Sequence, residues 1–201
     1  MFAQQAYLAD ITPVISEAKP SGAVITLRSM KSIGRQISLM QTRKEQGIDN
    51  IIGQSAKIKL LTEQTLRYAE LELPVLVTGE TGTGKELIAR AIHNAGSRSK
   101  APFLAINCAA LPEHLLESEL FGYSSGAFTG AQKGGKPGLF ELANGGTLFL
   151  DEVAEMSVYL QAKLLRFLQD FSFRRVGGTS ELKVNVRIIS ATHQNLTELI
   201  G

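Results

Sequence analysis

The sequence lacks the features of secreted and membrane proteins. Its 201 residues include one cysteine, Cys108, so an internal disulfide is excluded. No apolar run approaches the roughly 20 residues that a membrane-spanning helix needs. The first residues have neither the basic start nor the apolar core of a secretion signal. These absences predict a protein of the reducing cytoplasm with no membrane partner.

A strong charge of either sign is also absent. The formal net charge is +2, so the chain has no electrostatic footprint of a nucleic-acid-binding domain. The three histidines, His93, His114 and His193, have no metal-ligand spacing. Cys108 is interpreted as a packed thiol rather than a nucleophile. With 44% hydrophobic and 20% charged residues, the composition predicts one sizeable soluble core with a short appended segment.

A glycine-rich stretch lies between the apolar run 73–78 and a helical pattern that follows Lys85. Glycines take positive φ readily, so such a loop wraps tightly and turns backbone N–H groups toward phosphate oxygens. The helix N-terminus adds its dipole, and Lys85 adds a charge for the β and γ phosphates. The pattern predicts an ATP site with these residues: Gly79, Glu80, Thr81, Gly82, Thr83, Gly84, Lys85 and Glu86.

A plain glycine-rich turn is the alternative interpretation of this stretch. One departure from the usual pattern also matters. Glu86 occupies the place of the Ser or Thr whose hydroxyl usually holds Mg²⁺. Metal binding must therefore depend on a carboxylate elsewhere.

The second half of the expected site is a buried strand pattern that ends in two acids. Asp151 is predicted to hold Mg²⁺, and Glu152 to polarise the attacking water as a general base. Two acids at a helix N-terminus, where the dipole favours them, are the alternative. The residues that open this run are also expected to contact the nucleotide: Ala143, Asn144, Gly145 and Gly146.

The chain divides near Gly47. Residues 1–30 predict two strands, 7–15 and 22–28, joined by a turn at 19–22, and a helical stripe and linker follow over residues 31–48. From residue 49, strands alternate with helices. Strands are expected at 75–77, 103–106, 148–150 and 184–191, and helices at 112–121 and 153–169. One face of the second helix is expected to carry Met156, Leu160, Leu164, Leu165 and Leu168. This alternation predicts an α/β domain with a mainly parallel sheet covered on both sides.

Two further segments have polar or exposed character. Thr192 and His193 end the last strand, where a polar side chain can sense a γ-phosphate or simply close the strand. Phe128 lies in a glycine-hinged loop and is a candidate contact for a protein partner, since an exposed aromatic is costly unless something binds it. A flexible loop with an incidental phenylalanine is the alternative.

Eight motifs occur in this order: GETGTGKE, NCAAL, ESELFG, GAFTGA, ANGGTLFLDE, LLRFLQD, RRVGG and VRIISATH. Together they resemble the P-loop AAA+ domain of bacterial sigma-54-dependent transcription activators, over about residues 49–201. The resemblance implies a three-layer α/β sandwich and a ring-forming ATPase, usually hexameric. It also implies that ATP hydrolysis remodels the closed complex of sigma-54 RNA polymerase.

The same resemblance assigns roles to single residues. Asn107 would hold Glu152 away from water as a switch, and Ile52 and Gly53 would border the adenine. Arg174 and Arg175 would lie near a subunit boundary, with a solvated basic turn as the alternative. The loop that would bind sigma-54, chiefly through Phe128 and Thr129, is this: Gly126, Ala127, Phe128, Thr129, Gly130 and Ala131.

In the family, the arginine fingers, the helical lid and the DNA-binding helix-turn-helix lie beyond the position of residue 201. We therefore expect a fragment, truncated before the lid, that has little ATPase activity alone. Residues 1–47 resemble more loosely the join between a PAS sensor and the ATPase in TyrR-like regulators. That likeness leaves open a nucleotide-gated repressor module with little turnover. A third possibility is an AAA+ remodeller with another client.

Overall fold

A computed structural model describes residues 7–16, 19–29, 47–129 and 131–195, and the chain divides into two units. The first unit, Met1–Arg43, contains an antiparallel pair of strands, β1 (Tyr7–Ser16) and β2 (Lys19–Ser29). The prediction of a turn at residues 19–22 is wrong, because β2 begins at Lys19, and Lys19, Pro20 and Gly22 already pair with β1. The helical stripe expected at 33–40 lies outside the described residues.

The second unit, Lys44–Gly201, alternates strands and helices as expected. Its helices are α2 (Ala56–Ala69), α3 (Lys85–Ala95), α4 (Glu113–Phe121), α5 (Leu139–Leu142) and α6 (Val158–Asp170). Its strands are β3 (Val75–Thr78), β4 (Phe103–Asn107), β5 (Thr147–Asp151), β6 (Ser172–Arg174), β7 (Glu181–Lys183) and β8 (Arg187–Thr192). Short 3-10 turns occur at η1 (Ile48–Asn50), η2 (Cys108–Ala110) and η3 (Val153–Glu155).

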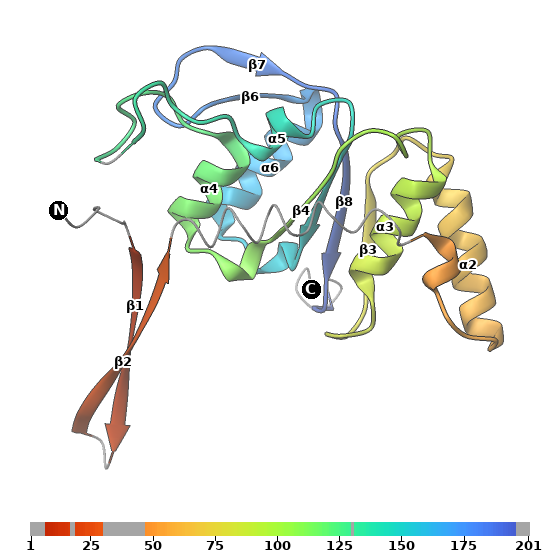
Figure 1. The fold of residues 1–201 in the computed structure, drawn as a ribbon, viewed down its shortest axis with the longest axis horizontal. Coiled ribbons are helices and arrows are strands. Elements are labelled where there is room, and N and C mark those ends of the chain that lie inside the picture. The colour runs from red at the N-terminus through yellow and green to blue at the C-terminus, as the bar shows by residue number, and fades with distance from the viewer. Residues whose placement is uncertain (1–6, 17–18, 30–46, 130, 196–201) are drawn as a thin grey trace. The chain divides into compact units, whose positions relative to one another are not determined.

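Four strands form one parallel sheet in the order β3-β8-β5-β4. Figure 1 shows α2 and α3 on one side of this sheet and α4, α5 and α6 on the other. The central strand β5 is apolar without alternation, and Leu148, Phe149 and Leu150 are at most 1% exposed. Continuous apolar sequence is what a strand covered on both faces requires. The predicted three-layer α/β fold is confirmed.

An aromatic cluster joins the helices on the α4–α6 side. Phe140 of α5 packs on Phe121 of α4 and on Phe167 of α6, with ring centroids 5.2 and 3.9 Å apart. Phe173 of β6 lies 5.9 Å from both Phe121 and Phe167. The cluster fixes β6 and the three helices as one packed layer.

The long helix expected at 153–169 is interrupted. Met156 has extended backbone (φ −64°, ψ 144°), and Ser157 then caps α6 by accepting a hydrogen bond from Leu160 N. Residues 153–155 therefore form only η3. Leu165, expected on the same face as Leu160 and Leu164, is 62% exposed, because at 3.6 residues per turn it lies about 140° around the helix from the buried Leu160.

The end of the chain also differs in detail from the expectation. The turn-rich segment 171–178 contains β6, whose partner β7 had not been predicted. Strand β8 begins at Arg187 rather than at residue 184. Within the part of the chain that the structure describes, each helix is too short or too polar to cross a bilayer.

One buried histidine gives the fold a pH dependence. His93 of α3 is 3% exposed, and its Nδ1 lies 2.9 Å from Thr147 Oγ1. Burial lowers the pKa of His93 from 6.5 to about 4. Between these values the unfolded chain binds a proton that the folded chain does not, so stability falls as the pH falls. We predict a loss of up to about 3 kcal/mol from pH 7 to pH 4 from this residue.

Urea unfolding of the 201-residue chain across pH 4–7 measures this contribution. His93→Gln should flatten that part of the pH profile. His114→Gln is the matched control, because His114 is exposed on α4 and its loss should leave the profile unchanged. An identical slope in both variants would contradict the assignment to His93.

Candidate functional site

The parallel register brings the predicted site together at one edge of the sheet. Thr78 pairs with Thr192, and Asn107 pairs with Asp151, so the strands end at the same level. The ladder continues into the glycine loop, where Gly79 N donates to Thr192 O at 3.2 Å. Ligands in open parallel sheets bind at this carboxyl edge.

The glycine loop leads directly into α3. Gly82 and Gly84 have φ values of 83° and 91°, which side-chain-bearing residues rarely adopt, and Gly84 is the N-cap of α3. The first N–H groups of α3 and the positive end of its dipole therefore face the loop. Thr83 Oγ1 donates to Glu80 O at 2.8 Å and tightens the turn. This geometry fits the phosphate site that the sequence predicted.

Lys85 connects the two halves of the site. Its Nζ donates to Gly79 O and Glu80 O at 2.9 and 3.2 Å, and it lies 3.5 Å from Glu152 Oε1. The side chains of Lys85 and Glu152 are only 8% and 13% exposed. A cation and an anion that are this close and this shielded attract each other more strongly than a surface pair.

The backbone of Glu152 is unusual. It has φ 51° and ψ 49°, a left-handed conformation that is rare for a residue with a side chain. Successive side chains of a strand point to opposite faces, and this conformation breaks that alternation directly after Asp151. Both carboxylates therefore reach the carboxyl edge of the sheet.

His193 at the end of β8 holds the Glu152 carboxylate. Oε2 of Glu152 accepts from His193 N at 3.1 Å and lies 2.6 Å from His193 Nδ1. Burial acts to raise the pKa of Glu152, but the hydrogen bonds from His193 and the charge of Lys85 outweigh burial and lower it. Glu152 is thus an ionised carboxylate. Sequence reasoning placed His193 at this edge but missed its contact with Glu152.

Asp151 is half-buried beside these groups. Burial and the neighbouring charge of Glu152 raise the pKa of Asp151. Its Oδ1 accepts from Glu152 N and its Oδ2 accepts from Asn107 Nδ2, both at 3.1 Å. Asn107 was expected to hold Glu152, and the structure places its amide on Asp151 instead. The amide follows the strand register, since Asn107 pairs directly with Asp151.

The side chains at this edge supply few of the oxygen ligands that Mg²⁺ needs. A carboxylate whose ionisation is disfavoured by a second acid gains from a nearby cation. In the described residues, no group of three His, Cys, Asp or Glu side chains is arranged to hold a metal. Mg²⁺ commonly takes one or two carboxylates and completes its shell with water and substrate phosphates. Asp151 is suited to that role.

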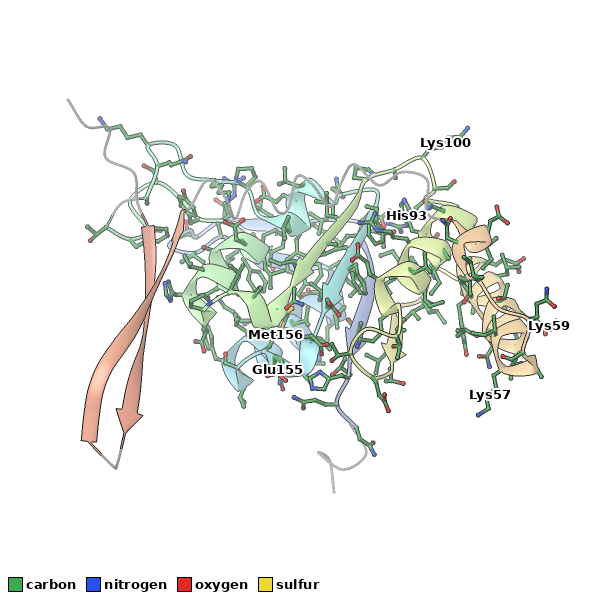
Figure 2. All side chains as sticks on the ribbon, turned by 60° about the horizontal axis from the view of Figure 1, so that its bottom comes forward. Lys57, Lys59, His93, Lys100, Glu155 and Met156 are labelled. Atoms are coloured by element: carbon green, nitrogen blue, oxygen red, sulfur yellow. The ribbon has the colours of Figure 1, made fainter. Side chains whose placement is uncertain are left out.

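Four residues assigned to the nucleotide lie elsewhere. Ala143, Asn144, Gly145 and Gly146 precede the amino end of β5, whose length separates them from Asp151 by roughly 13 Å or more. Their contacts there are structural, such as Asn185 N donating to Asn144 Oδ1. Figure 2 shows His93 at this end of the sheet, opposite to Glu155 and Met156 beyond the carboxyl end of β5.

An open groove of about 510 Å³ lies between η1 and α2. Gly53 lines it, whereas Ile52 is 91% exposed. The assignment of both residues to the adenine stays a prediction. Ile51, the neighbour of Ile52, also lines the groove.

The loop that contains Phe128 projects from α4. Its stem pairs Tyr123 with Lys136 and with Val176, and Lys136 Nζ contacts both carboxylate oxygens of Glu119 at 2.6 and 2.7 Å. Phe128 is 46% exposed, and its ring centroid lies 4.9 Å from that of Tyr123. Thr129 is exposed beside it. The predicted exposed aromatic is present, on a stem that the sequence did not reveal.

The remaining candidates have distinct surroundings. Arg175 pairs with Glu141 through two hydrogen bonds, whereas Arg174 is exposed; both line a cavity of about 460 Å³ beside α6. Thr192 is buried and its hydroxyl accepts from Gln194 N. Cys108 is buried, and burial raises its pKa to about 12, which fits the expected packed thiol.

Comparisons with known proteins agree with this geometry. The sequence profile of a family described as the Sigma-54 interaction domain matches residues 51–201. The HTH-type transcriptional regulatory protein TyrR of Salmonella typhimurium is 48% identical over 201 residues, which cover 98% of this chain and 38% of TyrR. The transcriptional regulator VasH of Vibrio cholerae is 57% identical over 150 residues, covering 75% of this chain and 28% of VasH.

Solved structures give the same result. NtrX from Brucella abortus in complex with ADP superimposes with a TM-score of 0.68 at 40% identity, covering 84% of this chain and 37% of NtrX. NtrX in complex with ATP has a TM-score of 0.68 at 41% identity, with the same coverage. The chain spans less than two fifths of the length of each of these relatives. It belongs to the family of sigma-54 interaction domains.

Proposed function

We propose that this chain is the nucleotide-binding part of an ATPase that regulates sigma-54-dependent transcription. The observation that carries the proposal is the joint position of Lys85 and Glu152, 3.5 Å apart at the carboxyl edge of the sheet, in the unit that also exposes Phe128. The NtrX complexes with ADP and ATP support ATP as the ligand. The family supports sigma-54 as the partner.

In this proposal each residue has a distinct task. The loop amides and Lys85 bind the phosphates, and Glu152 accepts a proton from the attacking water as general base. Asp151 would hold Mg²⁺, whose positive charge would offset the negative charge of the phosphates. Gly53, with Ile52 or its neighbour Ile51, borders the adenine.

In this proposal, ATP hydrolysis drives a conformational change in a protein partner. Phe128 and Thr129, at the loop tip, contact sigma-54 in its complex with RNA polymerase, so that closed promoter complexes open. Self-association into a ring, usually of six subunits, completes the active form. Contact with promoter-upstream DNA belongs to a helix-turn-helix outside this chain. Residues 1–30 are the end of a PAS-like sensor and residues 31–48 a signalling helix and linker, within a cytoplasmic protein.

A repressor module that binds ATP with little turnover is the second candidate. It is favoured by the TyrR match, which extends over 98% of this chain and therefore includes the first unit. Hydrolysis by the full-length protein separates the two candidates.

The first prediction concerns ATP binding. Lys85→Ala should weaken binding of ATP by the full-length protein on the order of tenfold or more, because a charged hydrogen-bond donor to the phosphates is lost. Calorimetric titration measures the affinity. Lys100→Ala is the matched control, since Lys100 is exposed at the opposite end of the sheet (Figure 2). Equal affinities of both variants would refute the phosphate site.

The second prediction concerns hydrolysis. Glu152→Gln should preserve ATP binding and reduce phosphate release by the full-length protein on the order of 10²-fold or more, because the amide is not a base. Glu155→Gln, an exposed change three residues further on, should retain the wild-type rate. If Glu152→Gln and the wild type share the same low rate, the repressor module is the better assignment.

The third prediction concerns coupling to transcription. Thr129→Ala should leave ATP hydrolysis within about twofold of wild type, because the loop tip lies outside the phosphate site. Open-complex formation at a sigma-54 promoter should be lost, and permanganate footprinting measures it. Thr179→Ala alters another exposed threonine and should retain normal opening. Normal transcript yield from the Thr129 variant would point to a different client.

A further inference from the structure

The Glu152 carboxylate contacts two side chains at the carboxyl edge of the sheet, those of Lys85 and His193. Oε2 of Glu152 accepts from the backbone and the ring of His193, and Oε1 faces Lys85. Since an ionised carboxylate only accepts hydrogen bonds, Nδ1 of His193 must carry the proton in this contact. The bond is therefore charge-assisted and among the stronger kinds.

The surrounding backbone holds this contact in place. Glu152 has a left-handed backbone, and its side chain reaches from the end of β5 to His193 after β8. His193 directly follows Thr192, whose carbonyl accepts from Gly79 N at the start of the phosphate loop. Asn107 takes no part, since its amide is bonded to Asp151.

Lys85 is engaged in the same arrangement. Its ammonium group has three hydrogens, and it faces Gly79 O, Glu80 O and Glu152 Oε1. To bind β and γ phosphates, Lys85 must give up some of these contacts. A γ-phosphate beside Lys85 also brings negative charge close to Glu152, which disfavours the carboxylate where it now lies.

We propose that His193 is a positioning residue that holds Glu152 against Lys85 and so opposes the entry of a nucleoside triphosphate. The inference rests on the proposed function, in which Lys85 binds phosphate and Glu152 is the base. It assigns to His193, which directly follows β8, the restraint on Glu152 that the family resemblance assigned to Asn107. Triphosphate binding then breaks the His193–Glu152 bond and frees the base.

The rival role for His193 is a direct contact with the γ-phosphate. The two roles predict opposite signs for one measurement. If His193 restrains Glu152, removing the ring favours triphosphate binding, because an opposing interaction is gone. If His193 contacts the γ-phosphate, removing the ring weakens triphosphate binding.

The contact itself is tested without nucleotide, by a double-mutant cycle on urea unfolding of the 201-residue chain. His193→Leu should lower the unfolding midpoint in the wild-type background, but much less in the Glu152→Gln background. His193→Asn places an amide nitrogen where Nδ1 lies and should restore most of the coupling. The Asn107→Ala and Glu152→Gln pair should be additive. An additive His193 cycle, or equal coupling in the Asn107 cycle, would overturn the proposal.

The consequence is tested on the full-length protein with adenylyl imidodiphosphate, which is not hydrolysed, and with ADP. His193→Leu should tighten analogue binding by roughly three- to tenfold. This change is smaller than the full strength of a charged hydrogen bond, because the bond is half-exposed. ADP affinity should change less, and His193→Asn should resemble wild type. Unchanged or weaker analogue binding would exclude the restraint.

A third variant separates failure of this inference from failure of the proposed function. If Lys85→Ala weakens binding of the analogue and His193→Leu does not tighten it, only the restraint is refuted. If Lys85→Ala has no effect on binding of the analogue, the phosphate site itself is refuted. The unfolding cycle remains informative in either case.

Discussion

The parallel pairing of β3, β8 and β5 is the constraint on which the site depends. It places the glycine loop after β3, the acids after β5 and His193 after β8 at one level of the sheet. Only the parallel direction does this, because antiparallel neighbours would send alternate strand ends to opposite edges. The continuous apolar sequence of β5 enforces the arrangement by demanding cover on both faces.

The charged and polar side chains at this edge are paired with one another. Lys85 faces Glu152, Glu152 binds His193, and Asp151 accepts from Asn107. Buried charges are costly unless paired, so such internal pairing stabilises the edge. It also means that a ligand gains affinity only by exchanging existing contacts for better ones. In the proposed function, exchange of the Lys85 contacts would couple binding of a triphosphate to the position of Glu152.

The sequence predicted what depends on local pattern and missed what depends on long-range contact. The glycine loop, the strand that ends at Asp151 and the exposed Phe128 each carry their own signal over a few residues. The break before α6 did not, because the apolar spacing of residues 153–169 reads as one helix and only the cap at Ser157 interrupts it. Asn107 donates to Asp151 because the register of β4 and β5 pairs these two residues, whereas the family resemblance assigned Asn107 to Glu152. The contact of Glu152 with His193 required the left-handed backbone of Glu152, which no sequence rule assigns to a glutamate.

The layer that follows the acids also carries the exposed loop. From Glu152 the chain passes through η3 to α6, whose Phe167 packs on Phe140 and Phe173 in the aromatic cluster. Beyond β6, Val176 exchanges backbone hydrogen bonds with Gly122 and Ser124 at the loop stem. Close-packed interiors transmit displacement because they leave few voids to absorb it. The chain after Glu152 and the loop stem are thus parts of one packed layer, joined through the aromatic cluster and the backbone of Val176.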